Sequence, residues 1–234
     1  MSKKSTEVMV VEHIFEVRHH ASGKFLDVRG LIADYIKAQG LFPHWNIDAN
    51  VINFRDDKET IKSDGAFIGY SSAGYIVYNP DTKNYFKDKA GSFWKNLKSN
   101  QHYNIPDLLR FGARSKIFIP INDSFENIHK KIFDAFFKNN INTIIKGKID
   151  DTQFVFDITD DIYKVKIKGG PVNKNEVEKY MSFQSEEFKK EGIYFDLDYT
   201  IIENIDEKNM KKYLEKSIEK TWIQVESILE EIGI

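Results

Sequence analysis

Asp196 and Asp198 are two aspartates whose type and spacing could do chemistry. They alternate with the apolar residues Phe195, Leu197 and Tyr199. Because alternate residues of a β-strand point to the same side of a sheet, both carboxylates should lie on one polar face. A carboxylate pair of this kind can hold Mg²⁺ or share a proton. Asp196 and Asp198 are therefore candidate metal ligands.

A row of lysines offers a second possibility. Lys164, Lys166 and Lys168 alternate in the same way and could contact the phosphates of a nucleic acid. On a strand next to Asp196 and Asp198, they would instead form a cross-strand ladder of opposite charges. The ladder accounts for both rows without any chemistry, and we prefer it to a metal or nucleic-acid site.

Arg110 and Arg114 flank Gly112 just before an apolar segment. A guanidinium group can bind a carboxylate or a phosphate through two parallel hydrogen bonds. The pair is therefore a candidate site for an anionic ligand or an acidic partner. Solvated arginines at the entrance of a strand are the alternative.

Other catalytic residue patterns are missing from the sequence. The chain has no cysteine, and neither a phosphate-binding glycine loop nor a G-x-S-x-G motif occurs. His13, His19 and His20 do not have the spacing of a zinc site, and adjacent residues of a strand point to opposite faces. We therefore predict no cofactor and favour a non-enzyme.

The composition limits the class of protein further. The 234 residues include 34 Lys and Arg against 36 Asp and Glu, a formal net charge of −2. Non-specific binding to nucleic acid usually needs a basic excess, so this balance disfavours it. Without cysteines or any apolar run of the roughly 18 residues that a membrane helix needs, we expect a cytoplasmic protein.

The elements that must position these residues follow from hydrophobic periodicity. In the first half, the patterns predict a strand at Val10–His19, a helix between Ser22 and Gly40, strands at 49–54, 66–70 and 75–78, and a helix at 85–97. In the second, they predict a strand at 117–121, a helix from about 125, strands at 154–158, 162–168 and 193–201, a turn at 169–171, and a long helix at 205–231. The sequence thus predicts an α+β fold with an antiparallel sheet and helices on one face.

The repeated order suggests an internal duplication of two β-α-β-β-β-α halves, 1–100 and 116–234, joined by a connection at 101–115. Phe25 and Phe125, and Ile32 and Ile132, correspond at a constant offset. Any two amphipathic helices in register share such positions, so duplication is one of two explanations. If it is real, the halves form a pseudo-two-fold arrangement like that of the TATA-binding protein, with Arg110 and Arg114 at the joint.

Three segments resemble the marks of one bacterial family. They are 11–18 (Val-Glu-His-Ile-Phe-Glu-Val-Arg), 109–114 (Leu-Arg-Phe-Gly-Ala-Arg) before a strand ending in Pro120, and 195–199 (Phe-Asp-Leu-Asp-Tyr) before a C-terminal helix. The family is sporadically distributed and its function is uncharacterised. The resemblance implies carriage on accessory DNA, which suits defence, toxin–antitoxin or regulatory roles.

We therefore predict a non-enzymatic binding or regulatory component of an accessory bacterial system, acting through a protein partner or a small anionic ligand. A metal-dependent phosphodiesterase or nuclease using Asp196 and Asp198 is the first alternative. A specific nucleic-acid-binding protein using Lys164, Lys166 and Lys168 is the second.

Overall fold

The computed structural model describes residues 9–57, 64–82, 84–137, 141–174 and 176–234. The strands are β1 (Val10–His19), β2 (His44–Ile47), β3 (Val51–Arg55), β4 (Gly65–Gly69), β5 (Ser72–Tyr78), β6 (Leu108–Pro120), β7 (Phe154–Asp160), β8 (Tyr163–Val172) and β9 (Gly192–Ile201). The helices are α1 (Gly23–Ala38), α2 (Tyr85–Lys98), α3 (Phe125–Phe136), α4 (Ile141–Ile145) and α5 (Met210–Glu231), with 3-10 turns η1 (Val177–Lys179), η2 (Glu186–Lys189) and η3 (Glu207–Asn209).

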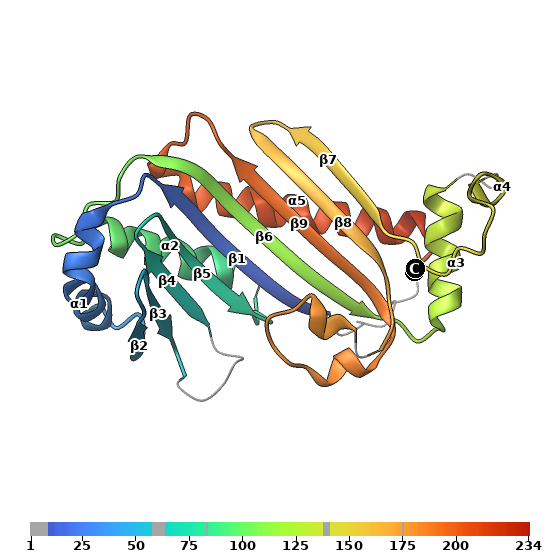
Figure 1. The fold of residues 1–234 in the computed structure, drawn as a ribbon, viewed down its shortest axis with the longest axis horizontal. Coiled ribbons are helices and arrows are strands. Elements are labelled where there is room, and N and C mark those ends of the chain that lie inside the picture. The colour runs from blue at the N-terminus through green and yellow to red at the C-terminus, as the bar shows by residue number, and fades with distance from the viewer. Residues whose placement is uncertain (1–8, 58–63, 83, 138–140, 175) are drawn as a thin grey trace.

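The nine strands of the described residues form one antiparallel sheet in the order β2-β3-β4-β5-β1-β6-β9-β8-β7. Helices α2 and α5 lie behind this sheet, and α1 and α3 stand at its two ends (Figure 1). The predicted α+β class with an antiparallel sheet is confirmed.

The central strand β1 shows why the two faces of the sheet differ. Its buried residues Val11, Phe15 and Val17 belong to the same core cluster as apolar side chains of α1, α2, α3 and α5. Glu16 and Arg18 alternate with them and point to the opposite side, as the period of two requires. We call that opposite side the open face, because none of these four helices packs on it.

Helix α5 packs along a continuous stripe, as its sequence period indicates. The buried members of the stripe are Met210, Tyr213, Leu214, Ser217, Ile218, Thr221 and Val225. Trp222 is partly buried and packs against the same core. Burial of one apolar face stabilises a helix of this length far more than its intrinsic propensity does.

Strand β6 is longer than predicted. The pattern placed a strand at 117–121, whereas β6 begins at Leu108 and pairs along its length with β1 and β9. Arg110 and Arg114 therefore lie within a central strand, and most of the segment predicted as a connection, 101–115, belongs to that strand. The local pattern is weak because Gly112 interrupts it, and pairing with two neighbouring strands compensates.

The turn predicted at 169–171 is wrong, because Gly169, Gly170 and Pro171 are part of β8. Gly169 faces Phe154 across the β7–β8 pair. A Cβ atom on Gly169 would lie 2.4 Å from Cζ of Phe154, so the glycine provides the space that this aromatic ring fills. The glycine here serves close packing within a strand rather than a turn.

Replacing Gly169 with alanine should therefore destabilise the protein by about 1–3 kcal/mol, because Phe154 must shift within a packed core. Gly30→Ala is the matched control. Gly30 lies in α1 with nothing within 4 Å of an added Cβ, and alanine there should stabilise by about 0.5–1 kcal/mol. Urea unfolding of both variants measures the difference. Equal effects of the same sign would contradict this packing role.

A second, smaller core covers one end of the open face. Residues of the segment between β8 and β9 pack on residues of β1, β6, β8 and β9; the cluster comprises Val10, Phe118, Val172, Val177, Met181, Phe183, Phe188 and Tyr194. The backbone N–H and hydroxyl of Ser182 both donate to Oε2 of Glu12, each at 2.8 Å. The rest of the open face lacks such a cover within the described chain.

The two halves share a strand order. β5, β4 and β3 follow outward from β1, and β9, β8 and β7 follow outward from β6, while β2 has no counterpart. β1 and β6 are adjacent and antiparallel at the centre. A shared order does not by itself establish a common origin, so duplication stays a prediction.

Candidate functional site

The open face brings together all seven residues that the sequence singled out. Arg110 and Arg114 lie on β6, Asp196 and Asp198 on β9, and the lysine row on β8. The pairing places Arg114 and Lys166 on either side of Asp198. Apart from Arg18, which lies opposite Arg110, charged side chains on this face therefore alternate in sign across β1, β6, β9, β8 and β7.

The two arginines are occupied by carboxylates of this chain. Arg110 donates to Glu16 at 2.9 Å on one side and to Asp198 at 3.0 Å on the other. Arg114 donates two hydrogen bonds of 2.6 Å to Asp196. Gly112 leaves room for the Arg110 guanidinium, since an added Cβ would lie 2.8 Å from its Nη1. An external anion would have to displace these partners.

The pKa shifts agree with a tightly coupled set of charges. The hydrogen bonds to Asp196 raise the pKa of Arg114, although burial acts in the opposite direction. Burial raises the pKa of Asp198, while Arg110 and Arg114 lower it. The arginines thus compensate carboxylates whose desolvation would otherwise be costly.

The lysine row bonds mainly toward β7 rather than toward β9. Lys166 forms an ion pair with Asp157 at 2.9 Å, and Lys164 donates to the hydroxyl of Thr159 at 3.0 Å. Carboxylate-bearing strands flank the row on both sides, so the lysines form no continuous basic surface. This arrangement gives no support to the nucleic-acid alternative.

The described residues around Asp196 and Asp198 form no cluster of metal ligands. Among the described residues, no group of three or more histidines, aspartates or glutamates has a geometry that could hold a metal ion. His13 is buried, shares a hydrogen bond of 2.8 Å with Ser115 and stacks on Phe86. It therefore belongs to the core.

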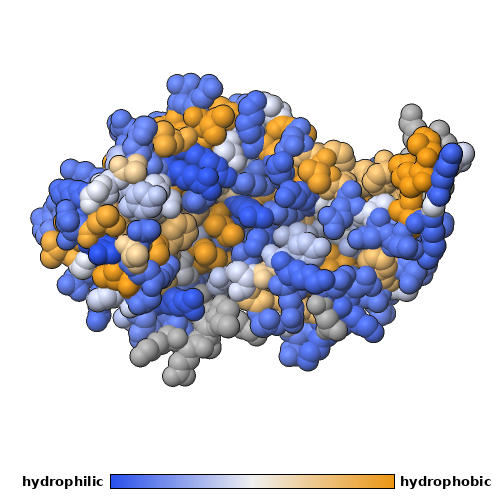
Figure 2. Space-filling model, in the orientation of Figure 1, coloured by the Kyte–Doolittle hydropathy of each residue, from blue (hydrophilic) through white to orange (hydrophobic). Residues whose placement is uncertain are grey.

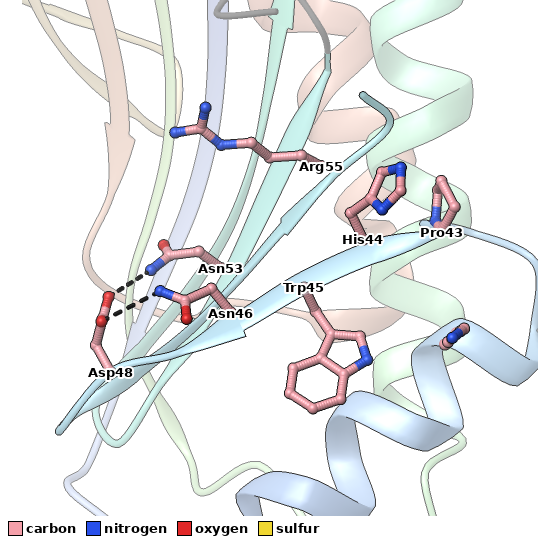
Figure 3. Close-up of a pocket in the computed structure, with 8 residues that line it drawn as sticks. Pro43, His44, Trp45, Asn46, Asp48, Asn53 and Arg55 are labelled. Carbon is pink, nitrogen blue, oxygen red and sulfur yellow. Dashed lines mark hydrogen bonds between the residues drawn. The ribbon is translucent and has the colours of Figure 1, made fainter. Parts of the chain in front are cut away.

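A groove that sequence reasoning did not predict lies at the opposite end of the sheet from β7. Its volume is about 750 Å³, within the range of small-molecule sites. The lining residues come from α1, the residue before β2, β2 itself, the turn after it and β3; they are Lys37, Pro43, His44, Trp45, Asn46, Asp48, Asn53 and Arg55 (Figure 3). The groove follows the edge strand β2.

Cross-strand pairing builds the polar wall of this groove. His44 pairs with Arg55 and Asn46 with Asn53, so these four side chains share the open face. The side-chain amides of Asn46 and Asn53 both donate to the carboxylate of Asp48, at 3.3 and 3.0 Å (Figure 3). Their amide oxygens remain as acceptors.

The groove also contains two cations that have no ion-pair partner among the described residues. The side chains of Arg55 and Lys37 make neither a hydrogen bond nor an ion pair with the residues that the structure describes. Asp48 is the one carboxylate among the described lining residues, and the two amides occupy it. Trp45, 40% exposed, points toward α1 on the other side of β2 (Figure 3). The wall around Arg55 suits an anion.

The sequence contained a weak signal for this site. Trp45 and Ile47 alternate with His44 and Asn46, but four residues are too few to distinguish a strand from a loop by period. Arg29 supports the turn by donating to the backbone oxygens of Asp48 and Ala49. This tertiary contact holds the turn against α1.

Comparisons with known proteins add no assignment, since neither family models nor curated proteins match this chain. No helix in the described part of the chain has both the length and the apolar character needed to cross a membrane.

Proposed function

We propose that this protein is a non-enzymatic binding component that recognises a small anionic ligand in the groove beside β2. The observation that carries the proposal is Arg55, whose guanidinium lines a large groove without a carboxylate partner in the described chain. Arg110 and Arg114, the arginines expected to hold an anion, are instead paired with carboxylates. The resemblance to a sporadically distributed family extends the proposal to an accessory bacterial system.

The neighbours of Arg55 define the class of ligand. A guanidinium binds phosphate or carboxylate oxygens through directed hydrogen bonds. The amide oxygens of Asn46 and Asn53 can accept from hydroxyl groups. A phosphorylated or carboxylated molecule that also carries hydroxyls, such as a sugar phosphate, combines both features.

The lining residues also favour binding over catalysis. The described residues of the groove include no serine, threonine or cysteine that could act as a nucleophile. The carboxylate of Asp48 accepts from two amides that hold it in place. No observation favours the phosphodiesterase or the nucleic-acid alternative over this proposal.

Isothermal titration with ribose 5-phosphate and with inorganic phosphate tests the proposal. We expect saturable binding of ribose 5-phosphate. The Arg55→Ala variant should bind it at least about tenfold more weakly, because losing one charge-assisted hydrogen bond costs about 1.4 kcal/mol of binding free energy. Arg18→Ala is the matched control, because Arg18 is an exposed arginine on the same face that pairs with Glu16 outside the groove. No binding of either anion, or equal losses in both variants, would overturn the proposal.

A further inference from the structure

β7 is the last strand of the sheet in the part of the chain that the structure describes. β7 pairs with β8 on one side, and no described strand lies on its other side. A free edge presents backbone N–H and C=O groups to any extended chain that approaches it. Natural proteins usually protect such an edge with lysine, proline or a bulge, and the sequence of β7 (Phe-Val-Phe-Asp-Ile-Thr-Asp) contains neither lysine nor proline.

Exposed apolar side chains gather at this edge. Val155, Phe156 and Ile158 on β7, with Ile162 in the β7–β8 turn and Ile202 after β9, are each between 38% and 53% exposed. Ile158 and Ile202 line one hollow, and Ile162 and Ile202 line another. Figure 2 shows apolar surface along the upper right outline of the molecule, where Figure 1 places β7. We call these five residues the β7 edge surface.

The aspartates of β7 are already compensated from within the chain. Asp157 pairs with Lys166 at 2.9 Å, and Asp160 pairs with Lys220 at 2.6 Å. Their charges therefore do not protect the edge in the way that unpaired charges protect other edge strands. An approaching strand meets apolar side chains and free backbone groups.

The charge order of the open face indicates what kind of strand fits. In the interior, Arg110 lies between two acidic neighbours, Glu16 on β1 and Asp198 on β9. Asp157 at the edge has a cation on the β8 side alone, and the alternation calls for another on the outer side. The incoming strand should thus carry a basic residue opposite Asp157 and apolar residues at alternate positions, packing beside Phe156 and Ile158.

A second copy of β7 does not meet this requirement. It contains Asp157 and Asp160 and no basic residue, so an antiparallel β7–β7 pair would offer Asp157 no cation on its outer side. We propose that the β7 edge surface binds an extended segment of a partner protein with alternating basic and apolar residues, which adds to the sheet as a tenth strand. This surface is independent of the ligand groove beside β2.

Fluorescence anisotropy with a labelled peptide, Lys-Val-Lys-Ile-Lys-Val-Lys, tests the proposal on the full chain. We expect the peptide to bind at least tenfold more tightly than a version with glutamate in place of each lysine. N-methylation of alternate peptide nitrogens should abolish binding, because it removes the backbone hydrogen bonds of an added strand. Hydrogen exchange should show new protection at amides of β7 when the peptide binds.

Two lysine variants make the test specific. Ile158→Lys introduces a protecting charge at the edge and should weaken binding at least tenfold. Ile223→Lys, at an isoleucine of α5 that is also well exposed, should leave it unchanged. Equal affinity for the basic and acidic peptides, or binding that survives Ile158→Lys, would overturn the proposal. Sedimentation experiments provide a further check. If the protein self-associates and Ile158→Lys abolishes that self-association, the surface binds a second copy of this chain and the proposal is overturned.

Discussion

Replacing Lys116 with methionine should destabilise the protein by about 3–5 kcal/mol at neutral pH, because it leaves a buried carboxylate without its cation. Glu12 is 1% exposed, and its Oε1 lies 3.0 Å from Nζ of Lys116. Its other oxygen accepts from Ser182. Hydrogen bonds to Ser182 alone do not replace the lost charge. Urea unfolding at pH 7 measures the loss.

A second substitution separates the charge from side-chain packing. Glu12→Gln combined with Lys116→Met removes both charges, while the glutamine oxygen can still accept from Ser182, so most of the lost stability should return. Lys130→Met is the surface control: Lys130 pairs with Asp134 in solvent, and the change should cost less than about 1 kcal/mol. A double variant no more stable than Lys116→Met would show that packing, not charge, explains the loss.

Acidification from pH 7 to pH 5 should destabilise the protein by about 2 kcal/mol through His13 alone. Burial lowers the pKa of His13 from 6.5 to about 3. The unfolded chain therefore takes up this proton at a higher pH than the folded chain does, and protons favour unfolding. The stability is present above pH 6.5 and is lost progressively as the pH falls toward about 3.

A non-titrating residue at this position isolates the effect. His13→Gln keeps a group that can bond to Ser115 but carries no proton uptake, so its free energy of unfolding should change less between pH 7 and pH 5. His44→Gln, at an exposed histidine of the groove, should keep the full dependence. Free energies of unfolding from urea titrations at both pH values give the comparison. If the free energy of unfolding of His13→Gln changes as much between pH 7 and pH 5 as that of the unmodified protein, the effect does not come from His13.

The open face explains why the loss of Lys116 should have a large effect in a protein with balanced charge. Charges on neighbouring strands compensate one another, so removing one member leaves another partly buried and unpaired. Arg110 shows this coupling, since it contacts Glu16, Asp198 and Thr200 on two different strands. The charge ladder predicted from the sequence is thus present as rows of opposite charge on neighbouring strands. Its ion pairs join Lys166 to Asp157 and the arginines to Asp196 and Asp198.

Local periodicity determined several elements of this fold by itself. β1 spans Val10–His19, the range that the pattern predicted, and its alternate residues Val11, Phe15 and Val17 are buried in the core. The long C-terminal helix, α5, follows in the same way from a stripe sustained over six turns. In these segments the order of neighbouring residues is enough to predict the element, because one face of each element must be apolar to be buried.

Only the tertiary structure decided which residues meet across the sheet. Arg114 and Asp196 are separated by 82 residues, and Arg110 and Glu16 by 94. The register of β1, β6 and β9 brings them together. The same holds for β2 and its groove, since four residues carry no reliable period and become a strand by pairing with β3. The free edge at β7 arises from strand order, which depends on how the whole sheet buries its core and not on any local pattern.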